Sequence, residues 1–484
     1  MTAALKWHAR WFVLLALFFS AVLLRFADLE LKPLHHDEGV NMMILRQLVD
    51  EGVYRYNPRG YHGPTLYYFA AIPSQLLGVN VVAARLTPAI FGLGIVLMMF
   101  LLRKELSPRV VIVAAGLLLV SPGMVFHARY FIHETLFVFF TLTLVVFAIH
   151  YARKPTVLRM AGVTSSAALL FATKETAFIS MGVLVIASLL ANVYTRFRGR
   201  KPADVATVRQ RRPVWVPVAV GFTVFVLISV LLFSSFFTYG EGLLGALVAF
   251  IFWGAQAGSD QTHPWWTYFT WLSRVEFPLL FLGVAGTVCA LWRADNRFKV
   301  FTAFWTMGIV SAYSLIPYKT PWLMLNFLVP LSLMAAVALE ELHRTGRRLT
   351  MFAACVFLVV YSTYQSLSLN FFRYDDESIP YVHAATSREF LGMVSRVEEL
   401  SLQLKSGAQT PIAVVHREHA PLPWYLRGFD HVSYHRGMTS TSDAIVIGTN
   451  AQEPSLGKLL GERYIRVGSW KRRNGVREVV YVRR

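Results

Sequence analysis

The sequence predicts an α-helical polytopic membrane protein with about eleven transmembrane helices, juxtamembrane helices and a small C-terminal α/β domain. Three observations predict this fold class. Only 15% of the 484 residues are charged and 55% are apolar, whereas roughly 25% are charged in an ordinary soluble domain. Apolar residues come in runs, such as WFVLLALFFSAVLL from Trp11, that approach the roughly 20 residues of a membrane-spanning helix. After Asn370, charges become frequent and the runs become short and alternating.

The apolar segments follow one another along residues 1–369 with short polar connections between them. The first run continues past Arg25 without a small-residue cleavage site, so we interpret it as a retained helix and not as a signal peptide. The predicted spans are residues 11–29, 82–102, 110–126, 135–151, 158–173, 176–194, 214–236, 277–292, 299–316, 321–340 and 348–366.

The net charge of +19 would suggest a nucleic-acid partner if the basic residues formed one soluble patch. They instead separate the apolar runs in alternate connections, and seven lie between Arg196 and Arg212. The positive-inside rule therefore places the N-terminus and the basic 195–213 loop in the cytoplasm of a plasma (inner) membrane protein. The loops 30–81 and 237–276 and the domain 370–484 then face outward, and no nucleic-acid partner is expected.

One apolar segment, TLYYFAAIPSQLLG at residues 65–78, is an ambiguous candidate for a twelfth crossing. It is short, contains Pro73 and is rich in tyrosine, which favours a helix at the membrane interface.

The last part of the chain, residues 370–484, reads as strands in PIAVVH, DAIVIGT, ERYIRVGSW and REVVYVRR and as a helix near 387–404. We expect it to hold the acceptor, with polar residues such as His416, His419 and Arg427 lying apart from the chemistry. Cys289 and Cys355 lie inside apolar runs, so no disulfide or zinc framework is expected.

The densest polar cluster is His35, His36, Asp37 and Glu38, directly after the first span. Two adjacent carboxylates at a membrane face are costly to desolvate without a task or a partner. They could simply cap the helix that follows. A divalent metal is another alternative, although four consecutive residues cannot all converge on one ion. No cofactor is assigned.

Further outward turns repeat this mixture of charges. HARYFIHET contains Arg129, His133 and Glu134, TKET contains Lys174 and Glu175, and YKTPWL contains Lys319. Any one of them could be an ordinary interfacial salt bridge or a snorkelling side chain. Together they indicate an outward site where cations bind a lipid-linked phosphate and a carboxylate takes a proton from a hydroxyl.

These motifs resemble the GT-C superfamily of membrane glycosyltransferases. The resemblance rests on the acidic pair, YHGPTLYYF, Arg85, SPG followed by HARYFIHET, the late YKTPW, and PLPWYLRGF from Pro421. The chain is similar to protein O-mannosyltransferases of glycosyltransferase family 39. It most closely resembles the flippase-activity-associated proteins of archaeal-type protein glycosylation.

The resemblance implies a polyprenyl-phosphate sugar as the donor. We expect the sugar to pass to an acceptor hydroxyl, on protein, lipid or glycan, with inversion, because the hydroxyl attacks from the face opposite the phosphate. Asp37 and Glu38 would form the catalytic pair, and Glu134 would be the second acidic position, where many relatives have Asp. The remaining expected site residues are Arg129, Lys319, Lys174 and Arg85 for the donor phosphate, and His36, Tyr61, His62, His133 and Glu175 for the sugar or acceptor.

One other function stays open, and a third is not favoured. A lipid-linked sugar flippase, or an accessory protein of one, would need polar groups along its spans, and the predicted spans are largely bare. A membrane-anchored binding module does not explain eleven spans.

Overall fold

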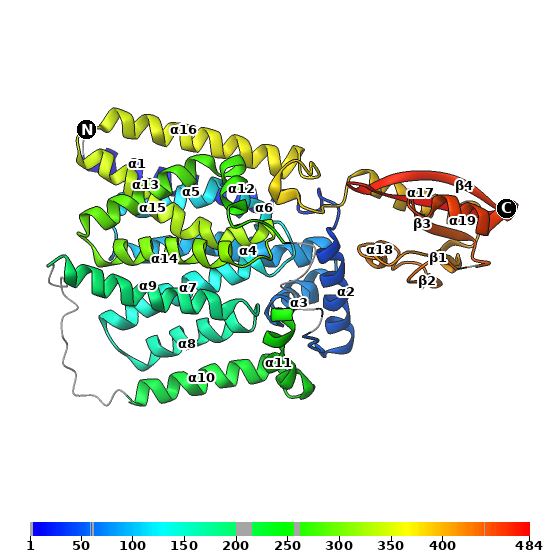
Figure 1. The fold of residues 1–484 in the computed structure, drawn as a ribbon, viewed down its shortest axis with the longest axis horizontal. Coiled ribbons are helices and arrows are strands. Elements are labelled where there is room, and N and C mark those ends of the chain that lie inside the picture. The colour runs from blue at the N-terminus through cyan, green and yellow to red at the C-terminus, as the bar shows by residue number, and fades with distance from the viewer. Residues whose placement is uncertain (1–2, 59, 61, 200–214, 256–261, 440) are drawn as a thin grey trace. The chain divides into compact units, whose positions relative to one another are not determined.

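A computed structural model describes the chain except residues 1–2, 59, 61, 200–214, 256–261 and 440 (Figure 1). The chain divides into two compact units. We call Met1–Leu29 with Gln47–Phe372 the helical unit, and Glu30–Arg46 with Arg373–Arg484 the C-terminal unit. The sequence assigned residues 30–46 to the membrane domain, whereas the structure groups this segment with the last part of the chain.

Each predicted span coincides with a helix or a helix pair of the helical unit. Helix α2 (His36–Glu51) begins in the C-terminal unit and ends in the helical unit. The others are α1 (Ala3–Phe26), α3 (Thr65–Leu77), α4 (Val81–Met98), α5 (Pro108–Val120), α6 (Pro122–Ala128), α7 (Glu134–Arg153), α8 (Val157–Phe171), α9 (Ala177–Phe197), α10 (Trp215–Phe233), α11 (Glu241–Ala255), α12 (Thr267–Val275), α13 (Phe277–Arg293), α14 (Arg297–Leu315), α15 (Leu325–Arg344) and α16 (Arg348–Leu367). Short 3₁₀ helices lie at Met99–Leu102 and Pro321–Met324, and a short π-helix lies at Ser368–Phe372.

The predicted number of spans is not confirmed. Within the described residues, six helices are long and apolar enough to cross a membrane, or up to eight if each of two bent helix pairs is one span. The pairs are α5 with α6, bent by 60°, and α12 with α13, bent by 117°. Helix α8 has only 15 residues, which is about 22 Å of helix against a hydrocarbon core of about 30 Å.

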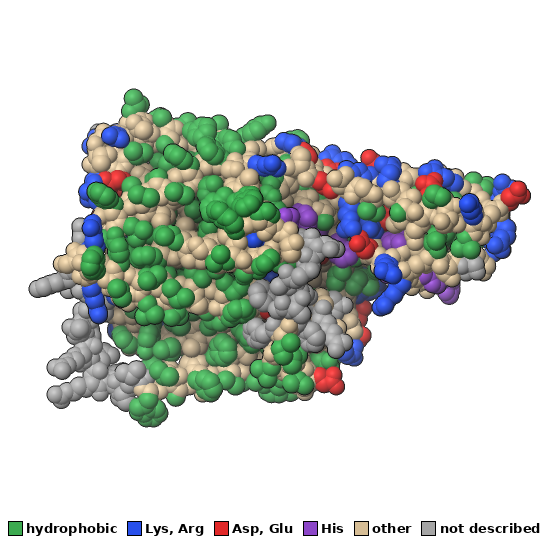
Figure 2. Space-filling view, viewed as in Figure 1, with side chains coloured by type: hydrophobic (Ala, Val, Ile, Leu, Met, Phe, Trp, Pro, Cys, Tyr) green, Lys and Arg blue, Asp and Glu red, His purple; other side chains and the backbone are tan. Residues whose placement is uncertain are grey.

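The sides of the helical unit are apolar, as Figure 2 shows for one face. On α9, Val185, Ile186, Leu189 and Val193 are 57–66% exposed. Exposed apolar stripes on successive long helices match a lipid surround, because lipid tails do not penalise apolar exposure as water does. The helical unit is therefore that of a multi-pass membrane protein.

The break between α5 and α6 is held by two buried charged residues. Arg25 Nη2 donates to the Leu118 carbonyl, 3.0 Å away, at the end of α5. Glu276 Oε1 accepts from Ser121 Oγ at 2.7 Å and from the Gly123 N–H at 3.0 Å, at the start of α6. Helix ends leave backbone groups without intrahelical partners, so a cation on the carbonyl end and a carboxylate on the amide end stabilise the bend.

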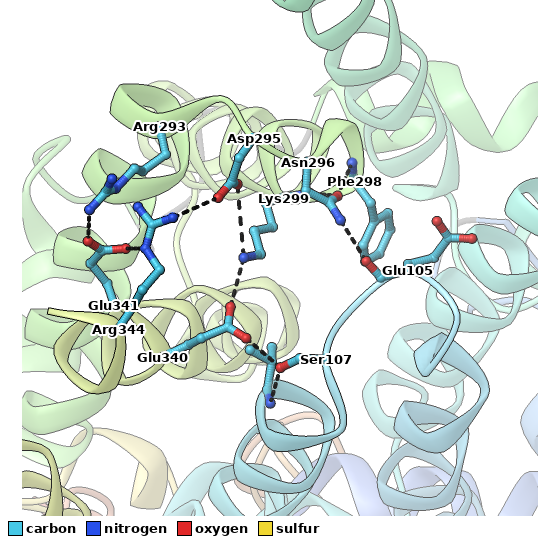
Figure 3. Close-up of polar contacts among 11 residues, drawn as sticks. Glu105, Ser107, Arg293, Asp295, Asn296, Phe298, Lys299, Glu340, Glu341 and Arg344 are labelled. Carbon is cyan, nitrogen blue, oxygen red and sulfur yellow. Dashed lines mark hydrogen bonds and ion pairs between the residues drawn. The ribbon is translucent and has the colours of Figure 1, made fainter. Parts of the chain in front are cut away.

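A network of ion pairs joins the ends of α13, α14 and α15 (Figure 3). Lys299 Nζ lies 2.7 Å from Glu340 Oε2 and 4.0 Å from Asp295 Oδ1. Arg344 contacts Asp295 at 3.8 Å and Glu341 at 3.1 Å. The positive-inside argument counted these basic residues as signals for a cytoplasmic face, and the structure shows that they also link helix ends.

The C-terminal unit contains a five-stranded sheet with the strand order β2-β1-β3-β5-β4. Its strands are β1 (Ile412–Val414), β2 (Val432–Tyr434), β3 (Ile445–Thr449), β4 (Tyr464–Arg473) and β5 (Val476–Arg483). Strand β1 is parallel to β2 and β3, whereas β5 is antiparallel to β3 and β4. The four predicted strands are present, and β2 escaped prediction because Val432–Tyr434 is flanked by polar residues and has no apolar run like the one that contains β1.

Helices cover both faces of this sheet, which confirms the predicted α/β class. Helix α17 (Glu389–Gln403) packs on the face that contains Ile445 and Ile447. Helix α19 (Glu453–Leu460) packs on the opposite face with Val446. Neighbouring strand residues point to opposite faces, so β3 supplies both cores. The short α18 (Leu422–Tyr425) follows β1.

Candidate functional site

The acidic pair begins helix α2, and the two carboxylates are placed differently. Glu38 is 1% exposed, and its Oε2 accepts a hydrogen bond of 3.2 Å from the backbone N–H of His35. His35 is the residue before the helix, so Glu38 occupies the position from which a glutamate caps a helix N-terminus. The capping alternative therefore applies to Glu38.

His35 completes this cap with its ring. Nδ1 of His35 accepts from the Asp37 N–H at 3.0 Å, and Nε2 lies 3.1 Å from the His383 carbonyl. The two contacts fit the neutral tautomer with its proton on Nε2. Burial lowers the pKa of His35, although the nearby Asp37 and Glu38 oppose this.

Asp37 differs from its neighbour because its side chain is 43% exposed. Its carboxylate lies 3.9 Å from Nδ1 of His35, beyond hydrogen-bonding distance. The helix N-terminus on which it lies stabilises negative charge. Of the two acids, Asp37 is the more exposed.

A second polar cluster lies in the helical unit, and we call His62, His133, Glu134, Lys174 and Glu175 the helical-unit cluster. All five were predicted as site residues from separate outward segments, and the structure brings them together. Lys174 Nζ is paired with Glu134 Oε1, and both side chains are almost fully buried. The ion pair joins the start of α7 to the turn between α8 and α9.

Glu175 forms hydrogen bonds with two further side chains near the buried ion pair. Its Oε2 lies 2.8 Å from Nδ1 of His62, and its Oε1 accepts from Tyr56 Oη at 3.1 Å. Burial would raise the pKa of Glu175, but His62 and its hydrogen bond lower it to about 2. Glu175 is therefore an ionised, buried carboxylate that orients the imidazole of His62, which is 43% exposed.

The backbone at Gly63 brings His62 and His133 close together. Nε2 of His133 lies 3.1 Å from the Gly63 carbonyl, and the two imidazole centroids are 5.3 Å apart. A Cβ atom at Gly63 would lie 2.1 Å from the Ala172 carbonyl oxygen. Only glycine allows this close backbone approach, which explains the glycine of the YHGP motif.

The four predicted phosphate ligands are not alike. Lys174 is neutralised by Glu134. Arg129 is buried, with Nη2 donating to the Asp28 carbonyl at 2.8 Å, and Arg85 donates to the Leu29 carbonyl at 2.7 Å. Lys319 Nζ bonds to the carbonyls of Ile316 at 2.5 Å and His263 at 3.2 Å. Arg129 and Arg85 thus both donate to backbone carbonyls of the turn that follows the first helix.

The predicted role of Tyr61 lies outside the described residues. Within the part of the chain that the structure describes, no group of three or more His, Cys, Asp or Glu side chains is arranged to hold a metal ion. Sequence reasoning missed Arg25, Tyr56 and Glu276. A charged residue inside an apolar run was the available signal for Arg25.

Comparison with known proteins identifies the fold. Residues 55–245 match the family model described as dolichyl-phosphate-mannose-protein mannosyltransferase. No curated protein matches the sequence. The structure of ArnT from Cupriavidus metallidurans bound to undecaprenyl phosphate is similar with a TM-score of 0.68, at 16% identity, over 96% of this chain and 97% of that one. The apo state of ArnT gives 0.69 at 16% identity, over 99% and 98%.

A third similar structure is the archaeal oligosaccharyltransferase AglB from Archaeoglobus fulgidus, in complex with an inhibitory peptide and a dolichol-phosphate. It matches with a TM-score of 0.60 at 12% identity, over 92% of this chain and 70% of that one. At these identities the structures establish the fold, and the family match covers less than half of the chain. The resemblance noted in the sequence is confirmed at this level: the chain has the fold of the GT-C membrane glycosyltransferases.

Proposed function

We propose that this protein transfers a sugar from a polyprenyl-phosphate donor to an acceptor hydroxyl on the outer face of the membrane, with Asp37 as the general base. The observation that carries the proposal is the contrast within the acidic pair. Glu38 is buried and caps its own helix, whereas Asp37 is 43% exposed. A base must come within hydrogen-bonding reach of the proton that it removes.

Besides the base, the proposed reaction needs only cations that stabilise the leaving phosphate. The acceptor oxygen bonds to the anomeric carbon as its proton passes to the Asp37 carboxylate, and the phosphate leaves from the opposite face with the bonding electron pair. This single displacement inverts the anomeric centre. Phosphate is already a good leaving group, so cations need only stabilise its charge.

Lys319 and Arg129 are the better candidates for the donor phosphate. Their described partners are neutral carbonyls, so neither cation is neutralised as Lys174 is. Two of the three N–H donors of Lys319 have such acceptors, which leaves a third for a ligand. Arg85 and Lys174 would then support the donor site indirectly. Three members of the helical-unit cluster, together with two residues near the start of the chain, are proposed to bind the sugar or the acceptor: His62, His133 and Glu175, with His36 and Tyr61.

The acceptor class is proposed from the comparisons. The matched family model is described as a protein mannosyltransferase, and AglB was solved with a peptide. A protein acceptor is therefore the first to test, with lipid and glycan acceptors as the other outcomes. Whether the transfer requires a divalent metal is a further question, which transfer assays with and without a chelator would answer.

A flippase is less well supported. In the described membrane helices, charged residues lie within about two turns of a helix end. A translocator should carry polar groups near the bilayer midplane.

The experiment is transfer by the purified full-length protein, given radiolabelled polyprenyl-phosphate sugars and a membrane extract as the acceptor source. Asp37→Asn should lower turnover by on the order of 10²–10⁴ while donor binding persists. Glu38→Gln is the matched control, because glutamine can still accept the capping hydrogen bond. If Asp37→Asn keeps the parental turnover, Asp37 is not the base, and if the parent transfers no sugar, the proposed function is wrong.

The proposed orientation has its own test. Alkaline phosphatase fused after Arg484 should be active, and alkaline phosphatase fused near Arg209 should be inactive, because a basic loop resists translocation. The reverse pattern would overturn the assignment of the outer face.

A further inference from the structure

The segment that contains the acidic pair forms hydrogen bonds with residues between positions 383 and 425 of the C-terminal unit. The backbone of Leu34 is held at both of its polar groups. Its N–H donates to Tyr425 Oη at 2.8 Å, and its carbonyl accepts from Thr386 Oγ1 at 2.7 Å. Leu34 and Thr386 are buried. These hydrogen bonds join residues more than 350 positions apart.

The next residues repeat this arrangement. The His35 ring contacts the His383 carbonyl through Nε2 and receives the Asp37 N–H at Nδ1. The His35 ring therefore links the backbone of His383 to the backbone of Asp37. His36 Nδ1 lies 3.3 Å from the Ala420 carbonyl.

The first turn of α2 also packs tightly on Pro421. A Cβ atom at Gly39 would lie 2.7 Å from both Cα and Cβ of Pro421. No side chain fits there without movement, so Gly39 lets the helix approach the PLPWYLRGF segment closely. Residues 34–39 are thus fixed by backbone contact as well as by hydrogen bonds.

We infer that two segments of the C-terminal unit, His383–Thr386 and Ala420–Tyr425, are positioning elements for Asp37. The inference rests on the proposed function, in which Asp37 is the base. It adds a role to the expected one of holding the acceptor, and it rests on residues other than the His416, His419 and Arg427 named from the sequence. The C-terminal unit then determines where the carboxylate stands when the acceptor hydroxyl arrives, whatever else it binds.

The argument is one of geometry. A general base works only within about 2.6–3.2 Å of the proton donor, and a misplacement of about 1 Å can cost a factor of about 10² in rate. Asp37 lies in the first turn of α2, and no side-chain hydrogen bond of its own fixes it among the described residues. Its position must come from the backbone of residues 34–39.

The test compares Tyr425→Phe with Tyr464→Phe in the full-length protein. Tyr425→Phe removes only the oxygen that accepts from Leu34. Tyr464→Phe is the matched control, because its hydroxyl bonds to the carbonyls of Thr441 and Asp443 in the same unit, away from residues 34–39. We expect Tyr425→Phe to lower kcat about 5- to 10-fold, the equivalent of one lost hydrogen bond, with the donor KM unchanged.

A second measurement does not depend on activity. Hydrogen exchange at residues 34–40 should accelerate in Tyr425→Phe and in Thr386→Val, but not in Tyr464→Phe. Restoring a polar group, in Tyr425→His, should recover part of the lost kcat if its ring nitrogen reaches Leu34.

The outcomes separate the two proposals. A parent that transfers no sugar refutes the proposed function, and the exchange data then still decide whether the C-terminal unit holds residues 34–39. An active parent with equal kcat in Tyr425→Phe and Tyr464→Phe refutes the positioning inference. So does a fall in kcat that is the same in both variants, because that result shows a general loss of stability.

Discussion

The helical-unit cluster and the acidic pair look alike in the sequence, since both combine histidines with carboxylates beside an apolar run. In the structure they differ in what holds their charges. The helical-unit cluster pairs Glu134 with Lys174 and Glu175 with His62, from segments that are far apart in the chain. In the acidic pair, Glu38 is used by its own helix and Asp37 is half exposed.

The comparison separates charges that are used by the fold from charges that are available to a ligand. A buried carboxylate with a cation and a hydrogen-bond donor is stabilised where it is, and moving it costs several kcal/mol. A carboxylate at an exposed helix start can meet a new partner at small cost. This difference supports the proposal that Asp37 takes the proton and that Glu134 and Glu175 have a structural or ligand-orienting role.

The largest expected effect comes from breaking the buried pair. Lys174→Met leaves the Glu134 carboxylate buried without its cation, and losing one partner of such a pair costs about 3–5 kcal/mol. The measurement is thermal unfolding of the purified protein in detergent. Arg293→Met is the control, because it breaks a more exposed pair with Glu341 and should cost less than about 1 kcal/mol.

The double variant Lys174→Met/Glu134→Leu tests the mechanism of this loss. Replacing both partners by apolar residues removes the uncompensated charge, so much of the stability should return. If the double variant is as unstable as the single one, the loss comes from packing and the charge argument is wrong.

The fold was largely predictable because it depends on apolar runs and alternating strands. Each predicted span coincides with a helix or a helix pair, although the predicted span 110–126 runs through the break at Ser121 and Pro122 between α5 and α6. The number of spans was not predictable, because short helices such as α8 and the bent pair α12–α13 do not show in hydropathy alone. Helices α11 and α19 were missed for a related reason, since they lie in segments expected to be loops or strand connections.

The sequence named residues that meet in the helical-unit cluster, but it could not show which partner each of them has. Lys174 and Arg129 are equally basic in the sequence, yet one is paired with a carboxylate and the other with backbone carbonyls. Which partner a charge meets depends on tertiary contacts between distant segments. The hydrogen bonds between residues 34–39 and residues 383–425 are also tertiary contacts between distant segments. No local pattern in either segment predicts them.

A smaller effect is expected from removing the cap. Glu38→Ala deletes the acceptor for the His35 N–H and should cost about 0.5–2 kcal/mol, the usual range for a lost helix cap. Asp37→Ala should stay within about 0.5 kcal/mol of the parent, as surface substitutions do. Urea unfolding followed by circular dichroism compares the two. Equal losses would show that both acids are structural, which would break the distinction drawn between them.

The smallest expected effect is a dependence on pH of the local stability around the acidic pair. Burial lowers the pKa of His35 in the folded protein, against the opposing influence of Asp37 and Glu38, with His36 also lowering it. Below the unfolded value of about 6.5, the unfolded segment therefore binds the proton more readily than the folded one, and stability falls as the pH falls. A protonated ring would also lose Nδ1 as the acceptor for the Asp37 N–H.

Protection of residues 34–40 against hydrogen exchange should consequently decrease from pH 7.5 to pH 5.5, after correction for intrinsic rates. The decrease should be at most about tenfold, since one unit below the unfolded value corresponds to about 1.4 kcal/mol. His35→Asn keeps a side chain that can cap the helix but cannot titrate, so its protection should not change over this range. A parent as insensitive to pH as His35→Asn would mean that His35 does not hold Asp37 through its neutral ring, and the carboxylate would have to be positioned by Leu34 and Gly39 alone.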